Sequence, residues 1–396
     1  MQCEAPERAA RPALEVADLV RDFGEAFRRQ YVVTPEQAAV LRAIRACRTW
    51  ALGGHLDVCT QCGLERPSYN SCRNRHCPKC QALAQAQWLD GRSERILPVG
   101  HFHVVFTVPD SLNRLTAYRR EELFAILFSA AAETLRELAA THLGAELGIT
   151  MVLHTWTRDL RFHPHVHAIV TAGALSLDAE RWVARPDFLF PVRVMGALFR
   201  GKFLDKVRAL YRRGDFAGFD HFRDPQAFGR WMARLAKKRW VVYAKRPFGA
   251  AAQVLEYLGR YTHRVGISNR RLLERRDDLV TFATKDGGTA TIHGVQFLRR
   301  FVQHVLPKRF VKIRHYGLYA SSSVDTKLAH ARLAIPTTPH DEHEHEHEHE
   351  HEHEREHDRP AWKRLIERLT GVDVDRCARC CAAAMVTRPL PAWDTS

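Results

Sequence analysis

The chain lacks a long apolar run and has no visible secretion signal. Its longest apolar stretch, residues 123–132, is interrupted by Ser129 and followed by Glu133, so it is too short to cross a bilayer. The first residues include Glu4 and Arg8 with no apolar segment behind them, unlike a secretory leader. We therefore expect a soluble, cytoplasmic protein that does not interact with membranes.

Negative charge is concentrated in one short segment. Residues 340–358 hold ten acidic residues and one arginine, so the rest of the chain carries a net charge of +24, against +15 for the whole. A basic surplus of this size favours an anionic polymer as partner, and nucleic acid is the commonest one. Histidine and glutamate alternate through much of 336–358 with no apolar face to bury, which predicts a disordered linker.

The apolar periodicity changes between helical and strand patterns along the chain, which predicts an α+β fold. Residues 1–54 are expected to be helical, with Thr34 as an N-cap before Pro35. A single domain is expected over 95–325. Its predicted strands are 101–109, 151–156, 165–171, 240–245, 279–284 and 288–293, and its predicted helices are 119–148, 195–213, 225–239 and 251–263.

Ten cysteines in a chain without a secretion signal indicate metal binding before disulfides. Cys59 and Cys62 form one C-x2-C knuckle, and Cys77 and Cys80 form another after fourteen residues. Two such knuckles can complete a tetrahedral site, so we predict that these four thiolates hold one structural Zn²⁺ in a module over 55–90. Three further residues are within range as alternative ligands: His55, Cys72 and His76.

Arginines and an aromatic residue are interleaved in the same module. Arg73 and Arg75 follow Tyr69, and this combination suits phosphate contact and base stacking. We predict that the two arginines bind DNA. The alternative is a zinc staple that only holds domains together.

The C-terminal tail, 359–396, contains a second group of cysteines, Cys377, Cys380 and Cys381. No second knuckle accompanies them there. An independent zinc site in this tail is therefore not expected.

A histidine pair stands in one of the predicted strands. His165 and His167 are two residues apart, so the strand period places them on the same face, where they can share a divalent cation that polarises a phosphate oxygen. The pattern is weak by itself, because His101 and His103 have the same spacing in an earlier strand. Other features must decide between the two pairs.

A tyrosine pair lies on the predicted helix 251–263. Tyr257 and Tyr261 are four residues apart and share one helical face, which Gln253 extends by one turn. Arg260 and Arg264 suggest a phosphate-facing surface. A phenol, with a pKa near 10, is a poor nucleophile, but it can attack a phosphodiester when a metal withdraws charge from the phosphate.

The order of Phe106-Thr-Val-Pro109, the histidine pair and the tyrosine pair resembles the three motifs of rolling-circle nucleases. Longer strings resemble rolling-circle insertion-sequence transposases with an N-terminal zinc-binding domain and a two-tyrosine His-hydrophobic-His (HUH) nuclease domain. The fold implied is a helical and zinc-ribbon-like N-terminal module, then a domain with a central antiparallel sheet flanked by helices. The matching strings cover the chain in order from about residue 13 to 325: 71–80, 162–167, 257–269, 299–307 and 314–317.

The resemblance implies that His165 and His167 bind Mg²⁺ or Mn²⁺, while His101 and His103 are structural. It implies that Tyr257 or Tyr261 attacks the scissile phosphate, leaving a 5′-phosphotyrosine and a free 3′-hydroxyl. The other tyrosine serves a second cleavage or transfer. The phosphotyrosine keeps the energy of the bond, so no nucleotide cofactor is required.

A third ligand to the catalytic metal is expected. Gln253 is the first candidate because it shares the tyrosine face, and His163 and Glu256 are alternatives. The implied partner is single-stranded DNA at transposon ends and at the target, bound at the bacterial nucleoid.

Two other functions fit parts of the pattern. A rolling-circle replication initiator or relaxase would share the metal and tyrosine chemistry but recognise a plasmid origin. A non-enzymatic zinc-dependent DNA-binding regulator would not need the tyrosines at all.

Overall fold

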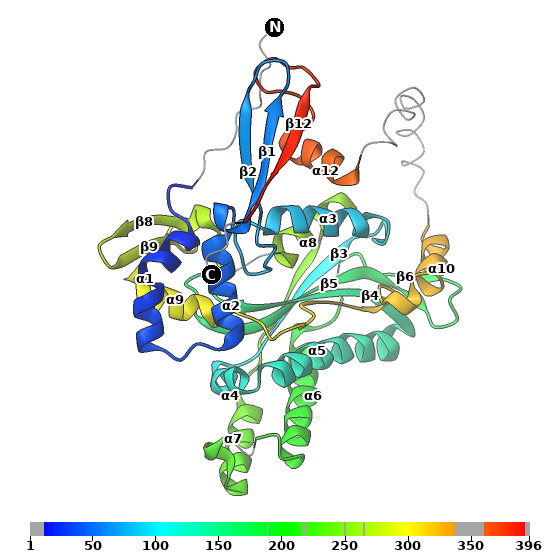
Figure 1. Ribbon diagram of the computed structural model, residues 1–396. Helices are drawn as coiled ribbons and strands as arrows, with labels where there is room; N and C mark the ends of the chain where they lie inside the picture. Colours follow the sequence, from blue (N-terminus) through cyan, green and yellow to red (C-terminus); the bar gives the residue numbers. More distant parts are fainter. Residues whose placement is uncertain are drawn as a thin grey trace. The chain divides into compact units, whose positions relative to one another are not determined.

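The computed structural model describes residues 12–187, 189–216, 219–248, 251–263, 266–336 and 360–392 (Figure 1). The chain divides into two compact units. One comprises Met1–Trp88, Ile267–Val305 and Thr338–Ser396, and the other comprises Leu89–Gly266 and Leu306–Thr337. The predicted α+β class is confirmed. Apart from residue 336, the His/Glu segment predicted as a linker lies outside the described residues.

None of the helices in these described ranges combines the length and the apolar character that crossing a bilayer requires.

The second unit is built on an antiparallel sheet. Its central strand β5 (Phe162–Ser176) lies between β4 (Ala145–Trp156) and β3 (His101–Thr107), and the order is β11–β4–β5–β3–β7. Strands β7 (Val242–Phe248) and β11 (Ile313–Gly317) form the edges. A short strand, β6 (Trp182–Ala184), pairs with β5.

The two faces of this sheet differ in polarity because successive side chains point to opposite sides. Val104 and Val166 belong to the apolar face, whose core includes side chains of α5 (Arg120–Leu143) and α6 (Val192–Arg212). Figure 1 shows these two helices on one side of the sheet and α8 (Ala251–Thr262) on the other. The unit also contains α4 (Asn113–Tyr118), α7 (Pro225–Lys237) and α10 (Lys327–Ala334).

The helix predicted over 119–148 ends earlier than expected. Its last turn stops at Leu143, because Gly144 adopts a left-handed conformation (φ 58°) and caps the helix. Strand β4 begins at the next residue, Ala145, so the helical prediction for 145–148 is wrong. The apolar residues at 145 and 147 thus belong to the alternating pattern of β4 and not to the helix.

The first unit contains the N-terminal helices α1 (Val16–Gln30) and α2 (Pro35–Ala46). Thr34 caps α2 as predicted, accepting a hydrogen bond from the Gln37 amide at 3.3 Å. The unit also holds two small sheets, whose strands are β12–β1–β2 and β8–β9–β10. Their bounds are β1 Gly54–Cys59, β2 Glu65–Tyr69, β8 Leu272–Arg276, β9 Leu279–Ala283, β10 Thr289–His293 and β12 Met385–Leu390. Its other helices are α9 (Gly294–Val302) and α12 (Ala361–Thr370), and α3 (Gln81–Ser93) crosses the boundary between the units.

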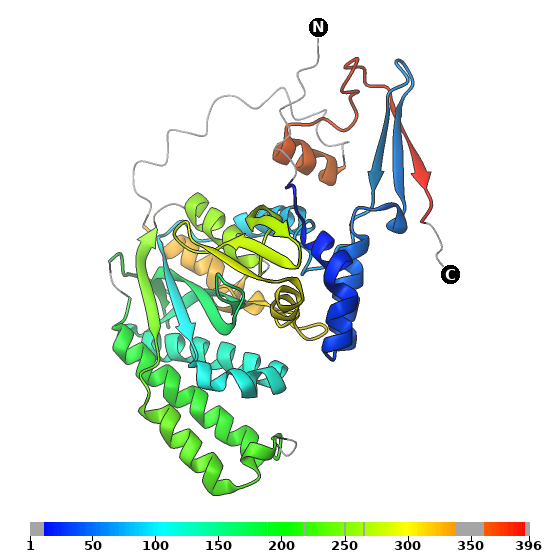
Figure 2. The same ribbon diagram turned by 90° about the vertical axis from the view of Figure 1, so that its left-hand side faces the viewer.

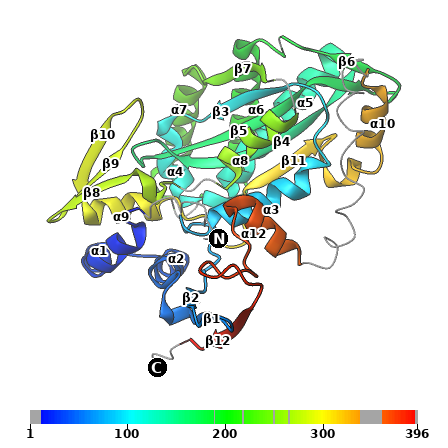
Figure 3. The same ribbon diagram turned by 90° about the horizontal axis from the view of Figure 1, so that it is seen from above.

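The predicted hairpin at 279–293 is present as β9 and β10, but residues 267–305 group with the N-terminal helices rather than with one domain over 95–325. Figure 3 shows α9 beside α1 and next to the β8–β10 sheet. The contact is close because Gly294 begins α9 where the ring of Phe23 lies; a Cβ at position 294 would come within 2.3 Å of that ring. The apolar side of α1 therefore packs against α9, which comes much later in the chain.

We expect Gly294→Ala to destabilise this unit by about 1–3 kcal/mol, since the added methyl group overpacks the contact with Phe23. The matched control is Gly24→Ala in α1, where a new Cβ would meet Val20 at an ordinary 3.8 Å. That change should stabilise the helix by about 0.5–1 kcal/mol. Denaturant unfolding and amide hydrogen exchange in α1 and α9 measure both effects. A neutral Gly294→Ala would contradict the packing described.

Candidate active site and metal centres

Three histidines gather on the polar face of the main sheet. His165 and His167 lie on β5, and His154 lies opposite His165 on the neighbouring strand β4. One ring nitrogen from each lies within 4.8 Å of the others, which is close enough to share a metal ion. His154 and His167 are buried, and their ring centroids are 4.5 Å apart. The predicted same-face pair is thus joined by a third imidazole.

Hydrogen bonds orient two of these rings. The Nδ1 of His165 lies 2.7 Å from the carbonyl oxygen of His163, to which it donates. The Nδ1 of His167 lies 2.8 Å from Nε2 of His103. Because both Nδ1 atoms are engaged, Nε2 is the atom that each ring offers to an ion. This arrangement, with the second ring nitrogen held by a protein group, is common for histidines that bind metals.

His103 connects the histidine cluster to a tyrosine. Its Nδ1 lies 2.6 Å from the hydroxyl of Tyr257 on α8, and the plane of its ring is nearly parallel to that of His167 (interplanar angle 8°). Burial, helped by the charges of Lys245 and His165, lowers the pKa of His103 to about 4. The ring is therefore neutral at pH 7 and carries one proton, which it can donate to only one neighbour.

His101 and His103 therefore have different roles. His101 is fully buried, and its ring nitrogens contact the Val99 carbonyl (2.8 Å) and the Tyr319 hydroxyl (2.6 Å). Those contacts hold the ring inside the core. His103 instead contacts both a predicted metal ligand and a predicted nucleophile, so its surroundings differ from those of His101.

Cations surround this face of the sheet. Lys245 lies opposite His103 in the register of β3 and β7. Lys312 lies over the Trp156 ring (5.3 Å), and Trp156 stacks on His154 (centroids 4.6 Å apart). The charges of Arg92 and Arg95 add to burial in lowering the pKa of His315 to about 4. The local potential is positive, as an anionic substrate requires.

The residues that the sequence suggested as third ligand do not join this histidine group. His163 is 3.2 Å from Asp110 through Nδ1, and within the described residues neither it nor Glu256 belongs to a group that could hold an ion. Gln253 is exposed on α8, and it stays an untested prediction. The sequence gives no signal for His154, because its strand contains no second histidine. Only the register of β4 with β5 brings it next to His165 and His167.

Three further predicted site residues cannot be placed. Tyr261 and Arg260 belong to α8, but their side chains lie outside the described residues, as does Arg264 entirely. The backbone of α8 keeps positions 257 and 261 one turn apart, consistent with the predicted helix.

Eight of the nine described cysteines of the first unit form two clusters of four. Cys47, Cys72, Cys77 and Cys80 make one, and the other consists of Cys59, Cys62, Cys377 and Cys380. The predicted single site of Cys59, Cys62, Cys77 and Cys80 is therefore wrong in its grouping. His55 and His76, the predicted alternatives, belong to neither cluster.

The reason for the division is the length of a hairpin. Cys59 ends β1 and Cys62 lies in the turn to β2, whereas Cys47 and Cys72 flank the base of the same hairpin. The base is closed by the Arg48 amide, which donates to the Asn70 carbonyl (3.0 Å). A six-residue strand spans about 17–20 Å, so thiols at the tip and at the base cannot share one ion.

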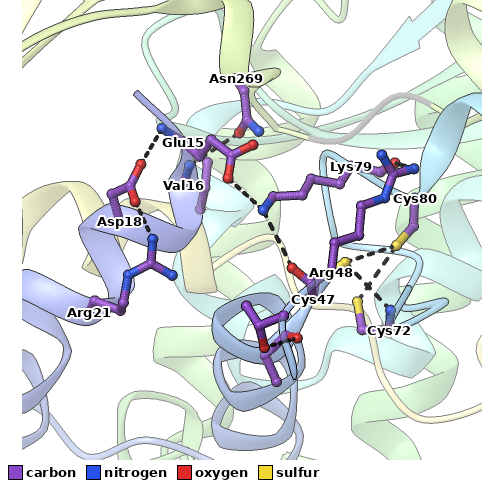
Figure 4. Close-up of polar contacts among 12 residues, drawn as sticks. Glu15, Val16, Asp18, Arg21, Cys47, Arg48, Cys72, Lys79, Cys80 and Asn269 are labelled. Carbon is purple, nitrogen blue, oxygen red and sulfur yellow. Dashed lines mark hydrogen bonds and ion pairs between the residues drawn. The ribbon is translucent and has the colours of Figure 1, made fainter. Parts of the chain in front are cut away.

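The cluster at the base has the geometry of a zinc site. Sγ of Cys80 lies 3.4 Å from Sγ of Cys47 and 3.7 Å from Sγ of Cys72 (Figure 4). Four sulfurs around zinc, with Zn–S bonds of about 2.3 Å, are separated by about 3.8 Å. Hydrogen bonds from the Cys72 and Cys77 thiols lower the pKa of Cys47. The donor set and spacing fit Zn²⁺.

Lys79 ties this cluster to the N-terminal helix. Its ammonium group forms an ion pair with Glu15 (2.5 Å) and donates to the carbonyl of Cys47 (3.4 Å), as Figure 4 shows. Arg73 and Arg75, the predicted DNA-binding residues, are exposed in the loop between Cys72 and Cys77, the second and third cysteines of the cluster. The cluster thus presents two cations to solvent from a loop fixed at both ends.

Comparison with known proteins finds two matching families. The family described as "Putative transposase" matches residues 148–326, and the one described as "Transposase zinc-binding domain" matches 19–108. "Putative transposase y4qJ" of Sinorhizobium fredii (strain NBRC 101917 / NGR234) is 41% identical over 98% of this chain and 100% of its own length. The "Transposase for insertion sequence element IS801" of Pseudomonas savastanoi pv. phaseolicola is 30% identical over 70% of this chain and 68% of its own. No solved structure matches.

We expect Cys47→Ser and Cys77→Ser to remove the same zinc ion, because their thiols belong to one cluster. Each single variant should lose one equivalent of zinc per chain, and the double variant should lose no more. Elemental analysis of purified protein measures the loss. A Cys47→Ser protein with its full zinc content would contradict the clustering.

Proposed function

Because the chain belongs to the family of insertion-sequence transposases with an N-terminal zinc-binding domain, we propose that it cleaves and rejoins single-stranded DNA through a phosphotyrosine. The single observation that carries this proposal is the contact chain from the metal-binding histidines to a tyrosine. It runs from His167 through His103 to the hydroxyl of Tyr257. A DNA-binding protein without nuclease activity has no use for such an arrangement.

The proposed metal ligands are His154, His165 and His167. Three imidazoles are donors that first-row transition ions accept more readily than Mg²⁺, which prefers oxygen. Of the two ions expected, Mn²⁺ is therefore the better match. When bound, the ion would withdraw charge from a non-bridging phosphate oxygen and make the phosphorus more electrophilic. The protein's part is to hold the three rings on one rigid sheet face.

The proposed nucleophile is Tyr257 or Tyr261. The phenol gives up its proton, and its oxygen forms a bond to phosphorus while the bond from phosphorus to the 3′ oxygen breaks. The DNA then carries a 5′-phosphate on tyrosine, and the departing 3′ oxygen takes up a proton to become a hydroxyl. Attack by a later 3′-hydroxyl reverses the step and releases the tyrosine, so no nucleotide cofactor is consumed.

His103 is proposed as a positioning residue for Tyr257. If His167 offers Nε2 to the ion, its Nδ1 carries the proton and donates to Nε2 of His103. The single proton of neutral His103 is then on Nδ1 and is donated to the Tyr257 oxygen, 2.6 Å away. A hydrogen bond donated to this oxygen holds it in place and stabilises the negative charge that it carries when it attacks.

The DNA is proposed to follow the cations of both units. Lys245 and Lys312 lie near the histidine face, and they suit contact with the phosphates on either side of the scissile bond. Arg73 and Arg75 are proposed to contact the transposon ends from the zinc-binding module, with Arg260 and Arg264 adding phosphate contacts beside the tyrosines. Phosphate contacts of this kind give affinity, so binding should weaken as salt increases.

We expect the double variant Tyr257→Phe/Tyr261→Phe to form no covalent adduct with an end-derived single strand in Mn²⁺, because no phenolic oxygen remains to attack. DNA binding should be unchanged, since both rings are retained. Denaturing gel electrophoresis and mass spectrometry of the protein–nucleotide adduct measure the outcome. Each single variant then identifies which tyrosine reacts with which strand. Persistent cleavage in the double variant would overturn the mechanism.

The same experiment separates the proposed function from the alternatives. A replication initiator or relaxase would form the adduct on a plasmid origin and not on an element end. A regulator would bind DNA and form no adduct with either substrate.

We expect His154→Ala to weaken Mn²⁺ activation by about 100-fold or more, as His165→Ala should, because each removes a proposed ligand. His103→Ala should keep its Mn²⁺ dependence. It should instead slow adduct formation at Tyr257 by about 10–100-fold, the usual cost of losing an outer partner. Titrating Mn²⁺ against the initial rate of cleavage distinguishes a metal defect from a positioning defect.

The role of His103 can be tested by combining His103→Ala with the loss of one tyrosine at a time. In a Tyr261→Phe protein, only Tyr257 can react, so His103→Ala should show its full effect. In a Tyr257→Phe protein, the same substitution should change the rate little. Equal effects in both backgrounds would show that His103 only supports the fold or His167.

A further inference from the structure

We propose that Cys59, Cys62, Cys377 and Cys380 bind a second structural Zn²⁺, which joins the two ends of the chain into one zinc ribbon. Cys59 ends the first β-strand and Cys62 follows it, whereas Cys377 and Cys380 precede the last strand. The matching zinc-binding family ends at residue 108, so it does not include the C-terminal pair.

The distances between the thiols fit a tetrahedral ion. Sγ of Cys59 lies 3.6 Å from Sγ of Cys380, and Sγ of Cys62 lies 3.5 Å from Sγ of Cys377. These separations are far longer than the 2.05 Å or so of a disulfide and close to the edge of about 3.8 Å expected for a ZnS4 tetrahedron. Each contact joins one N-terminal and one C-terminal cysteine, so the thiols of the two knuckles face one another.

The two knuckles also have the same backbone pattern. In the first, the Cys59 amide donates to the Leu64 carbonyl (2.9 Å) and the Gly63 amide donates to the Cys59 carbonyl (2.9 Å). In the second, the Cys377 amide donates to the Ala382 carbonyl (2.9 Å) and the Cys381 amide to the Cys377 carbonyl (2.9 Å). Two segments more than 300 residues apart thus fold into equivalent turns facing each other.

The residue after each knuckle is left-handed. Gly63 has φ 67° and Cys381 has φ 62°. Glycine adopts this conformation readily, whereas a side chain at this backbone angle costs free energy. An ion bound by Cys377 and Cys380 would hold the residues that lead into this left-handed turn.

Strand pairing places the knuckles together. Strand β12 pairs antiparallel with β1, from Gly54 opposite Leu390 to Cys59 opposite Met385. Figure 2 shows the C-terminal strand lying against the N-terminal hairpin. Asp57 reinforces the contact by accepting from the Thr387 hydroxyl (2.8 Å) and pairing with Arg66 (3.1 Å). The last strand of the protein is therefore a structural part of its N-terminal module.

We test the site by zinc content in the full-length protein. The wild-type chain should carry two zinc ions, and Cys380→Ser or Cys377→Ser should carry one. The matched control is Cys381→Ser, next to the site, whose sulfur is in a disulfide and belongs to neither cluster, and which should keep two. Amide hydrogen exchange in 385–390 should become faster in Cys380→Ser, while exchange in α1 stays unchanged. One zinc ion in the wild type, or two in Cys380→Ser, would overturn the proposal.

A second measurement covers the case in which the serine variants do not fold. Wild-type protein reconstituted with Co²⁺ should bind two equivalents with the intense sulfur-to-cobalt absorption of tetrahedral thiolate sites. Saturation of that absorption at one equivalent would overturn the second site without any substitution. Neither readout depends on nuclease activity, so the result is independent of the proposed function.

Discussion

The antiparallel register of β5 with its two neighbours determines the candidate active site. Pairing of His154 with His165 across β4 and β5 completes the histidine group, and the pairing of β5 with β3 brings His103 alongside His167. Because a strand alternates its faces, a slip of one residue would send these rings into the apolar core and core residues to solvent. The packing of α5 and α6 on the opposite face therefore stabilises the register on which the chemistry depends.

The site joins two kinds of structural element with different tasks. The sheet holds the proposed ligands rigidly, since strands within a paired sheet move little relative to one another. The helix α8 carries the tyrosines, and its contacts with the sheet include the 2.6 Å link between Tyr257 and His103. A nucleophile on a separate helix can leave the metal site after cleavage while it stays attached to DNA. That separation suits a reaction in which two strands are cut and exchanged.

The zinc-binding module also depends on contacts between segments that are far apart in the sequence. A small hairpin cannot bury enough apolar surface to be stable alone, and the cysteine clusters at its base and tip can supply the missing stability by binding metal ions. The base cluster joins α2 to the loop that presents Arg73 and Arg75. The tip cluster requires the C-terminal strand. A truncation that removes the C-terminal strand would therefore alter the N-terminal module, although the two are far apart in the sequence.

Local patterns in the sequence were enough to determine the α+β class, most strands and helices, the Thr34 cap, the same-face pair His165 and His167, and the tyrosine spacing. These features depend on neighbours within one turn or one strand. The end of α5 at Gly144 was missed because apolar periodicity there fits both states. Only the tertiary structure decided that His154 and His103 join the site, and that the cysteines divide into two clusters. Those choices depend on strand register and hairpin length, which bring together residues that no local pattern relates.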